Sequence, residues 1–331
     1  MVSSITGLGL AVPRHKLSAE EGKRVMSDHW PRLSSVNMEL VDRFLVTPLD
    51  QLFQPRSLGS RMRQYEVEAP LLGELAATRA LAAASTEPGD VDIVISVSCT
   101  GYMVPSLEVA LGQRMGLRAD VVRIPLTELG CSGGAAALSL AHRCLLGTPD
   151  AVVLVVCVEL CSLTFDPEDQ SLDNLTASLV FGDGAAAAVL TAGAPGLGIT
   201  GSRAMLLPDT ESLLGFRLVD SGFQPILSRH LPAVLGRGIA KTVSEFCDSP
   251  VDFYAVHAGG PRIFEAVERA LGLGPDSLSE SRRVFREFGN LSSASILFVL
   301  SALADQHGRG LALAFGPGLT LEMLALAGGS V

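Results

Sequence analysis

The chain has 331 residues, of which 48% are hydrophobic and 18% charged, with a formal net charge of −10. This length allows one large domain or two fused halves around a sizeable core, and the apolar composition excludes a disordered chain. The acidic balance, without a basic stripe, argues against a nucleic-acid partner. No signal-peptide pattern opens the sequence and the longest β-branched apolar run has eight residues, so we expect a cytoplasmic protein without a membrane span.

Short apolar runs rich in β-branched residues predict the buried strands of a central sheet. In chain order they are Ile5–Val12, Val91–Val97, Ala151–Val158, Ala185–Leu190, Phe253–Val256 and Leu311–Phe315. The helices predicted between them are Pro70–Ala84, Ser106–Met115, Ser132–Leu146 and Pro261–Leu271. We expect Pro70 and Pro261 in the first turns of their helices, where proline is tolerated. The alternation of strands and helices predicts an α/β layered fold.

A short pattern occurs twice. Phe181-Gly-Asp-Gly is followed by AAAAVLTA, and Phe315-Gly-Pro-Gly, 134 positions later, is followed by LTLEMLALA. We interpret this as a duplicated fold, with chance similarity as the alternative. The Gly- and Pro-containing stretch AGAPGLG is the expected boundary, which divides the chain into residues 1–195 and 196–331. Residues 201–232 are expected to be irregular and to line a pocket.

The strongest local motif is GCSGG, from Gly130 to Gly134, which joins a predicted strand at Val122–Leu126 to an Ala-rich helix. A helix start places the Cys131 thiol near unpaired backbone N–H groups and the positive end of the helix dipole. Both favour the thiolate, which is the nucleophilic form of cysteine. The flanking glycines leave room for a substrate. The alternative is a buried structural cysteine.

Two further residues are candidate partners of this cysteine. His257 ends the predicted strand DFYAVH and precedes a glycine-rich loop, where α/β proteins place active-site groups. The other five histidines stand in polar or amphipathic contexts. Asn290 stands in GNLSSA at the start of an apolar helix, where it either caps the helix or donates to a carbonyl oxygen that gains negative charge. For His257 the alternative is a hydrogen-bonded core residue.

Several motifs together carry a family resemblance. ELGCSGGAAAL, VFGDGAA, VHAGGPRIFEAVERALGL, FGNLSSASILFVL and AFGPGLTLE follow one another between Glu128 and Glu322. With FLVTPLDQLFQPR, they make the chain resemble the bacterial type III polyketide synthases of the chalcone synthase superfamily over nearly its whole length. The resemblance implies the thiolase fold, a five-layered αβαβα domain built from two duplicated halves and assembled as a homodimer.

The resemblance also implies roles for individual residues. Cys131 would carry the acyl group, while His257 and Asn290 would bind the thioester oxygen of malonyl-CoA as CO₂ leaves. The family pattern requires no metal and no cofactor besides its CoA thioester substrates, malonyl-CoA and an acyl-CoA starter. The residues that it assigns to substrate binding are the gatekeeper Phe181, together with Cys99, Thr164, Phe165, Ser292, Gly316, Pro317 and Gly318.

The roles of Cys99 and of three arginines, and the exact reaction, each have more than one interpretation. Cys99 resembles a second cysteine of bacterial tetrahydroxynaphthalene synthases, but a small buried core residue is the alternative. Arg43, Arg56 and Arg262 are candidates for CoA phosphates or are simply solvated charges. The activity expected is iterative condensation to a small aromatic or pyrone product. A β-ketoacyl-carrier-protein synthase III-like enzyme and an inactive thiolase-fold partner subunit are the alternatives.

Overall fold

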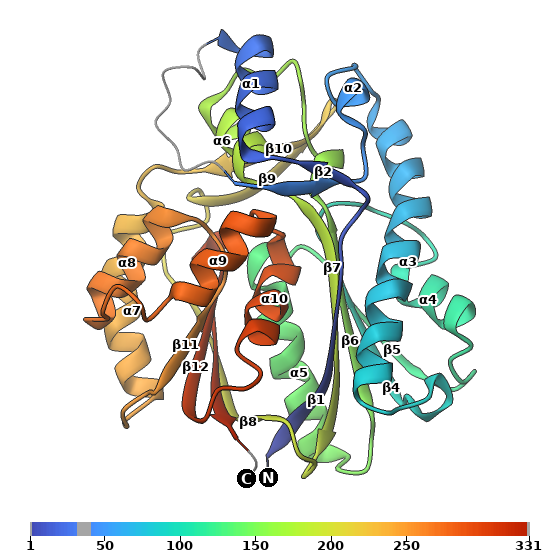
Figure 1. The fold of residues 1–331 in the computed structure, drawn as a ribbon, viewed down its shortest axis with the longest axis vertical. Coiled ribbons are helices and arrows are strands. Elements are labelled where there is room, and N and C mark those ends of the chain that lie inside the picture. The colour runs from blue at the N-terminus through green and yellow to red at the C-terminus, as the bar shows by residue number, and fades with distance from the viewer. Residues whose placement is uncertain (1, 32–40, 330–331) are drawn as a thin grey trace.

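The computed structural model describes residues 2–31 and 41–329, and its core is a large mixed sheet (Figure 1). The strands are β1 (Ser3–Ala11), β2 (His15–Leu17), β3 (Arg43–Leu45), β4 (Ile93–Val97), β5 (Val122–Leu126), β6 (Val153–Leu160), β7 (Asp183–Ala192), β8 (Leu197–Leu206), β9 (Leu214–Val219), β10 (Gly222–Leu227), β11 (Phe253–Val256), β12 (Gly308–Gly316) and β13 (Thr320–Gly328). The helices are α1 (Ala19–His29), α2 (Leu49–Leu52), α3 (Leu58–Ala83), α4 (Leu107–Met115), α5 (Gly133–Gly147), α6 (Leu172–Val180), α7 (Leu231–Phe246), α8 (Pro261–Leu271), α9 (Ser279–Phe288) and α10 (Ser295–Ala302). The predicted strands and helices are therefore all present; β5, β11 and α8 have the predicted ends, and the ends of the others are shifted.

The nine-stranded sheet contains the same strand arrangement twice. Its order is β11-β12-β13-β8-β1-β7-β6-β4-β5. The group β4-β6-β7-β1 has one parallel and then two antiparallel pairings, and so has the group β11-β12-β13-β8. The strands that follow the two Phe-Gly-x-Gly motifs, β7 and β13, occupy equivalent places. The internal repeat in the sequence is therefore a duplicated topology, and β5 is an additional edge strand of the first group.

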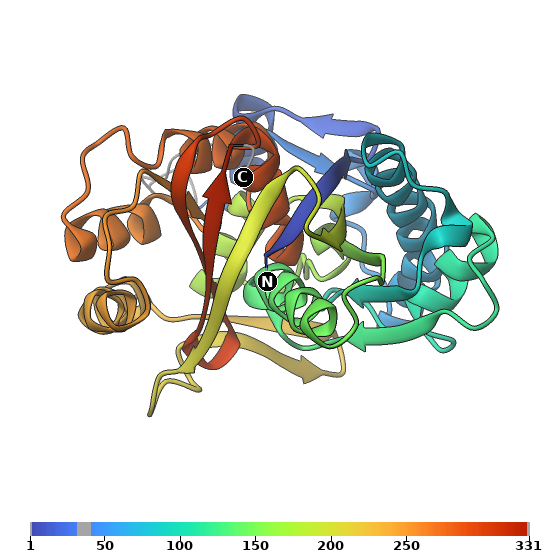
Figure 2. The same cartoon turned by 90° about the horizontal axis from the view of Figure 1, so that it is seen from below.

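The helices form the other layers. α5 contacts strands of both groups, namely β4, β6 and β7 on one side and β8, β12 and β13 on the other. Figure 2 shows α5 and α10 between the two groups, with α3 and α4 outside the first and α7 and α8 outside the second. Only three residue pairs between β1 and β8 join the groups, at Ser3–Ile199, Ser4–Gly198 and Ile5–Leu197. The predicted αβαβα order is confirmed.

The start of α3 differs from the prediction. The helix begins at Leu58, where the Ser57 side chain accepts a hydrogen bond from the backbone N–H of Ser60 at 3.2 Å. Pro70 lies inside this helix and is buried, not in the first turn. The serine cap sets the helix start, and burial of the proline ring offsets the loss of one backbone hydrogen bond.

The prediction that residues 201–232 are irregular is wrong. β8 extends to Leu206, and β9 and β10 pair antiparallel from Gly222–Val219 to Leu227–Leu214. The turn between them is short, and Gly222 adopts φ +130° there, in a region that favours glycine. The β9–β10 hairpin is separate from the main sheet, and its alternating small and large side chains gave only a weak strand signal.

Candidate active site

Cys131 lies at the junction between the two halves of the fold. A 3₁₀ turn, Gly130–Ser132, links β5 to α5 and carries the cysteine. Gly130 has φ +52°, and a Cβ there would come within 2.7 Å of Pro317. A Cβ on Gly134 would collide with the carbonyl oxygen of Ser293. These two glycines therefore let C-terminal loops approach the cysteine turn, and Gly130 also lines a pocket beside Cys131.

Asn290 is held by the backbone of the segment that carries Phe181. Its N–H donates to the Val180 carbonyl at 2.7 Å, and its carbonyl accepts from the Gly182 N–H at 3.0 Å. The side-chain Oδ1 accepts from the backbone N–H of Ser292 at 2.9 Å. This bond fixes the orientation of the carboxamide. The Nδ2 group lies 3.9 Å from the Cys131 sulfur, so an N–H donor stands beside the candidate nucleophile.

Ser292 also contacts the thiol. Its hydroxyl lies 3.8 Å from the Cys131 sulfur. Its φ of +48° is rare for a residue with a side chain, and Glu128 and Leu319 near the cysteine turn share this feature. Such backbone strain commonly occurs at functional sites. The described structure thus brings Cys131, Asn290 and Ser292 into direct contact.

His257 follows β11 and is almost completely buried, with 2% of its surface exposed. Its backbone N–H donates to the Leu313 carbonyl at 2.8 Å, while the ring atom Nδ1 is buried without a hydrogen-bond partner among the described residues. Burial lowers the pKa of this imidazole from 6.5 to about 3. His257 is therefore neutral at neutral pH. Its side chain makes no hydrogen bond to Cys131 or Asn290.

The environment of Cys131 favours the thiol. Burial raises the pKa of Cys131 to about 12, although contacts with Ser292 and Asn290 act in the opposite direction. The expectation that the helix start alone favours the thiolate is wrong, because loss of water around the sulfur outweighs the nearby N–H donors. A nucleophilic role therefore requires a base to remove the thiol proton.

Sequence reasoning missed a buried acid beside the site. Glu159 is fully buried at the end of β6, and its carboxylate accepts from Thr100 Oγ1 at 2.8 Å and Ser293 Oγ at 2.6 Å. The Cys99 sulfur lies 3.5 Å from this carboxylate and 3.4 Å from the Ser292 hydroxyl. Burial raises the pKa of Glu159. The sequence did contain a usable signal, because Glu159 is a single charged residue in an otherwise apolar buried strand.

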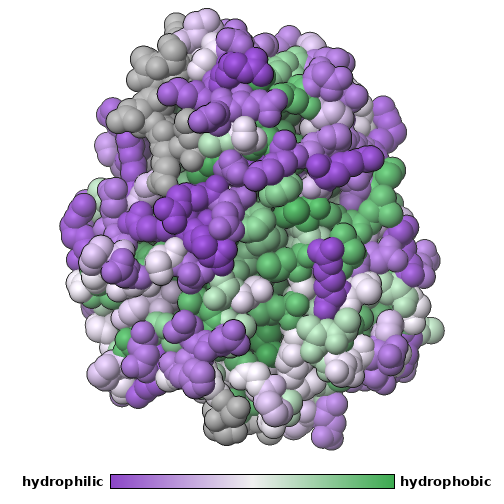
Figure 3. Space-filling view, viewed as in Figure 1, coloured by the Kyte–Doolittle hydropathy of each residue, from purple (hydrophilic) through white to green (hydrophobic). Residues whose placement is uncertain are grey.

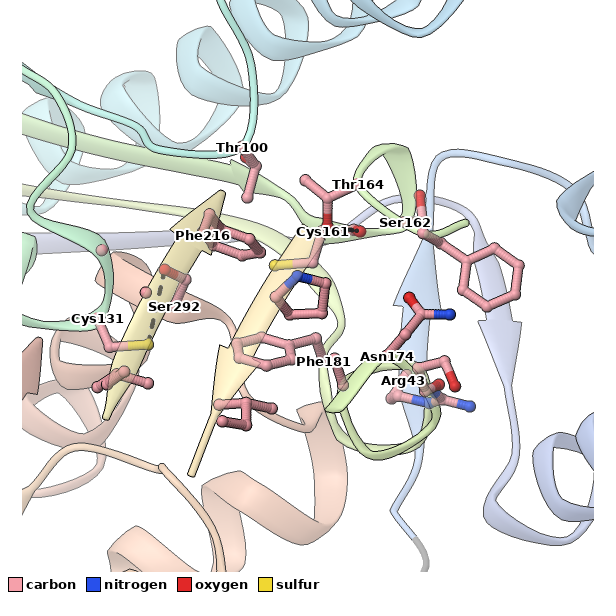
Figure 4. A pocket seen from close by; sticks show the side chains of 18 of the residues that line it. Arg43, Thr100, Cys131, Cys161, Ser162, Thr164, Asn174, Phe181, Phe216 and Ser292 are labelled. Carbon is pink, nitrogen blue, oxygen red and sulfur yellow. Dashed lines mark hydrogen bonds between the residues drawn. The ribbon is translucent and has the colours of Figure 1, made fainter. Parts of the chain in front are cut away.

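A chamber extends away from the thiol. Figure 4 shows Cys131 and Ser292 at one end, Arg43 and Asn174 at the other, and Phe181 and Phe216 between them. Of the predicted substrate-binding residues, the walls include Phe181, Thr164, Phe165, Ser292 and Pro317. Those that do not form the walls are Cys99, Gly316 and Gly318. The hairpin adds residues that the sequence did not single out, namely Leu214, Gly215, Pro225 and Leu227.

The three arginines considered for CoA phosphates have different environments. Arg43 is buried beside Asp183, and one of its N–H groups donates to the Ser178 carbonyl, so it is neither solvated nor accessible to a phosphate outside the chamber. Arg56 donates to Gln64 at 2.6 Å and to Thr47 at 3.4 Å. Arg262 is exposed near the start of α8. Of the three, Arg262 is the most exposed, so an outside phosphate reaches it most readily.

Two other kinds of feature are absent from the described residues. Residues 2–31 and 41–329 contain no group of three or more His, Cys, Asp or Glu side chains placed to bind a metal ion. In the same part of the chain, no helix is both long and apolar enough to cross a membrane.

The fold and the Cys131–Asn290 contact define a condensing enzyme of the thiolase fold. The models for the N-terminal and C-terminal domains of chalcone and stilbene synthases match residues 46–194 and 198–329. The chain therefore belongs to this family, the type III polyketide synthases, which are acyltransferases.

Individual relatives agree. The chain is 35% identical to 1,3,6,8-tetrahydroxynaphthalene synthase of Streptomyces coelicolor over 335 residues, covering 95% of this chain and 89% of the relative. It is 40% identical to the Streptomyces peucetius enzyme of the same name, covering 86% and 80%. The crystal structure of the Streptomyces coelicolor enzyme superposes with a TM-score of 0.92 at 32% identity, covering 99% of this chain and all of the other.

Proposed function

We propose that this enzyme builds an aromatic product from malonyl-CoA, with Cys131 as the acyl carrier and His257 and Asn290 as its catalytic partners. The observation that carries the proposal is the contact of the Cys131 sulfur with the Asn290 Nδ2 group, 3.9 Å apart, where Cys131 lines one end of the chamber. A nucleophile, an N–H donor and a water-poor cavity are the elements that thioester condensation requires.

Acyl loading begins with proton transfer. The Cys131 thiol has a raised pKa, so it needs a base, and the neutral His257 imidazole with its unpartnered Nδ1 is the candidate. The sulfur then attacks the thioester carbon of acyl-CoA, and the CoA thiolate leaves with the proton. The backbone N–H of Cys131 and the 316–318 loop would stabilise the oxyanion. Gly316 packs directly against Ser132 in the cysteine turn, which supports this role.

Chain extension uses the same donors differently. When malonyl-CoA occupies the chamber, its thioester oxygen accepts hydrogen bonds from Asn290 Nδ2 and the His257 ring. The C–C bond to the carboxylate breaks, CO₂ leaves, and the electron pair forms an enolate whose charge these donors stabilise. The enolate carbon attacks the Cys131 thioester, which releases the thiolate and lengthens the chain by two carbons. Donor groups placed in advance make a metal or a further cofactor unnecessary in this scheme.

Product chemistry is the most specific part of the proposal. Three Streptomyces relatives at 33–40% identity are named tetrahydroxynaphthalene synthases, whereas the phloroglucinol and α-pyrone enzymes are 31% and 30% identical. We therefore favour an all-malonyl aromatic polyketide. The Cys99 thiol, held between Glu159 and Ser292, supports this choice because those relatives resemble this stretch. Phe181 and Phe216 would confine the chain between its entry and its cyclisation.

One incubation tests this proposal. The purified protein is given ¹³C-labelled malonyl-CoA alone, and products are identified by mass. We expect a labelled polyhydroxylated aromatic compound. Condensation that occurs only with a malonyl carrier protein would instead indicate the β-ketoacyl-carrier-protein synthase III alternative. Absence of turnover with every acyl-CoA and carrier-protein substrate would support the inactive-partner alternative.

Assembly, location and domain division complete the proposal. We place the domain boundary at residues 195 and 196, between β7 and β8. We expect a homodimer, because exposed apolar side chains gather on α3 and near β5, in the N-terminal half. All six cysteines are free, which fits the reducing cytoplasm where malonyl-CoA is made.

A further inference from the structure

The β9–β10 hairpin forms one wall of the chamber without belonging to the main sheet. It makes a separate two-stranded sheet, and Leu214, Phe216, Pro225 and Leu227 line the chamber. A two-stranded hairpin alone is marginally stable in water. Its position over the chamber must therefore be fixed by contacts with neighbouring elements. At its base, the Leu227 N–H donates to Asp173 on α6 at 2.9 Å.

Arg61, in the first turn of α3, provides the contact at the hairpin tip. One guanidinium N–H group donates to the Ser221 carbonyl in the turn between β9 and β10. Another donates to the Phe165 carbonyl at 2.9 Å. Gly222 lies directly against the guanidinium, and a Cβ there would come within 3.0 Å of its central carbon. One side chain thus connects two separate walls of the chamber, the hairpin and the loop that carries Phe165.

Burial of the Arg61 guanidinium lowers the stability of the fold, so we expect its two hydrogen bonds to have a specific structural role. The side chain is 4% exposed, its Nε is buried without a partner, and its hydrogen bonds among the described residues go to carbonyl oxygens and not to a carboxylate. Burying a cation without an ion pair carries a large desolvation penalty, which the nearby negative charge of Asp166 offsets only in part. A planar guanidinium is, however, well suited to hold two acceptors in a fixed relative position, which lysine cannot do.

We propose that Arg61 is a positioning residue that determines product specificity by holding the hairpin tip and the Phe165 loop in the arrangement that shapes the chamber. It does not line the reaction chamber itself. It lines an adjoining cavity that shares Leu52, Ser162 and Phe165 with the chamber. The proposal rests on polyketide synthase activity, because a growing chain must fold against these walls before it cyclises.

The main test compares Arg61→Gln with Arg56→Gln. Arg56 lines the same adjoining cavity and carries the same charge, but it bonds only to Thr47 and Gln64, neither of which lines the reaction chamber. Products of labelled malonyl-CoA are separated into the main cyclised compound and early-released acids or pyrones. For Arg61→Gln we expect the ratio of cyclised to early-released product to fall about tenfold, since small misplacements of reacting groups are that costly. Malonyl-CoA decarboxylation should stay within about twofold, because Cys131 and Asn290 keep their contacts.

A second variant disturbs the contact between Arg61 and the hairpin tip by changing the hairpin instead of the arginine. Gly222→Ala keeps the Arg61 charge but pushes the guanidinium away from the hairpin tip. Its control is Gly193→Ala, which also places alanine at a positive φ, +68°, but in open space. We expect Gly222→Ala to reproduce the product shift and to increase hydrogen exchange in residues 214–227, and Gly193→Ala to do neither.

Three results would overturn the proposal. The first is a wild-type product ratio in folded Arg61→Gln, or in Gly222→Ala where Arg61→Gln does not fold. The second is an equal shift in Arg56→Gln, which would assign the effect to the charge of the adjoining cavity. The third is a product shift without increased exchange in the hairpin, which would separate specificity from the position of this wall. If wild-type protein makes no polyketide, the proposed function fails before this comparison begins.

Discussion

The orientation of one carboxamide decides which atoms face the candidate nucleophile. Both carboxamide atoms of Asn290 lie 3.9 Å from the Cys131 sulfur, but the oxygen already accepts from the backbone N–H of Ser292, which leaves the Nδ2 group as the donor to the site. The same residue therefore caps the following turn and donates to the site. At the sequence level these two roles were alternatives, but the structure combines them because the two ends of a carboxamide serve different partners.

Replacing this donor should impair decarboxylation selectively. Asn290→Asp keeps an oxygen for the Ser292 N–H but removes the N–H donors and adds negative charge near the sulfur. We expect the rate of CO₂ release from malonyl-CoA to fall about 10²–10³-fold. The control Ser295→Ala removes a hydroxyl that donates to the Asn290 oxygen at 3.5 Å and accepts from the Leu291 N–H at 2.8 Å, and it should retain most of the rate. A wild-type rate in Asn290→Asp would exclude the carboxamide as the enolate donor.

The buried imidazole should make the protein sensitive to acid. The folded pKa of His257 is about 3, below its ordinary value of 6.5, so the stability linked to this group is complete above pH 6.5 and is lost as the pH falls toward 3. His257→Gln removes this loss. The melting temperature of the variant relative to wild type should therefore rise as the pH falls from 7.5 to 4.5. A relative melting temperature that falls over this range would mean that His257 is charged in the native state.

The sequence predicted the candidate residues better than their environments. Cys131 and Asn290, 159 positions apart, are in contact as the family pattern implies. His142 stands in a polar or amphipathic context in the sequence, yet it is 5% exposed and hydrogen-bonded to Ser3 at 2.9 Å. Burial of a polar residue depends on which elements pack over it, and a local polar context does not reveal that. What distinguishes His257 from His142 is an unpartnered ring nitrogen, which only the structure reveals.

At the scale of elements, the contact between α5 and the 290–295 loop forms the site. Gly133 and Gly134 at the start of α5 lie against Ser293, and α5 also packs between the two strand groups. This close approach brings the cysteine turn and the Asn290 turn together. The close packing of the α5 start against the 290–295 loop therefore sets the distance between the Cys131 sulfur and the Asn290 carboxamide. We call this the spacer role of α5.

A single methyl group should disturb this spacing. Gly134→Ala would force its Cβ into the Ser293 carbonyl, with an expected loss of about 1–3 kcal/mol in the free energy of unfolding. Condensation activity should fall as the two turns separate. The matched control is Gly147→Ala at the other end of α5, where a Cβ meets nothing within 4 Å and the change should be below about 1 kcal/mol. Equal effects of both substitutions on denaturant unfolding would contradict the spacer role.

The ends of a helix or strand could be predicted where a clear start or stop residue marks them. β11 and α8 have the predicted ends, because α8 has proline near its start and Gly272, with φ +66°, at its end. The start of α3 and the β9–β10 hairpin were not predicted, since neither has a continuous apolar pattern. Arg61 and Asp173, from distant parts of the chain, hydrogen-bond to the backbone of the hairpin, and such contacts leave no periodic signal.

For the whole molecule, the proposed homodimer would use exposed apolar surface in the N-terminal half. Val67, Leu71 and Leu75 follow each other at intervals of four on α3, and Val104 and Val122 are also exposed, by 76% and 53%. Val122 starts β5, the edge strand of the sheet, whose unpaired backbone groups are available to a second chain. Figure 3 shows hydrophobic surface concentrated along the middle of one face, between hydrophilic areas on either side.

Charges on this surface should separate the subunits. In sedimentation experiments we expect wild type at twice the chain mass of 34.6 kDa, and Leu71→Asp/Val104→Asp as a monomer at low micromolar concentration. Leu218→Asp, at a position 66% exposed on β9, is the control that should remain dimeric. A monomeric wild type, or dissociation by the control alone, would contradict this interface.

The fold class could be predicted because the same sequence motif and strand pattern occur in both halves of the chain. The two Phe-Gly-x-Gly motifs precede β7 and β13, which hold equivalent places in the duplicated order. The arrangement of the halves was not deducible from pattern alone. It depends on α5 and α10 between the strand groups and on three residue pairs between β1 and β8. These contacts are long-range packing, for which local periodicity gives no information.

If the Cys131 sulfur carries the growing chain, acyl groups bound to this residue can be trapped during turnover. The protein is mixed with ¹³C-labelled malonyl-CoA, quenched in acid within milliseconds to seconds, digested and examined by mass spectrometry. We predict labelled acyl groups, increasing in two-carbon steps, on the peptide that contains Cys131, and none in Cys131→Ala. Label on Cys99 or Cys161 instead, or polyketide formed without any covalent intermediate, would contradict the account.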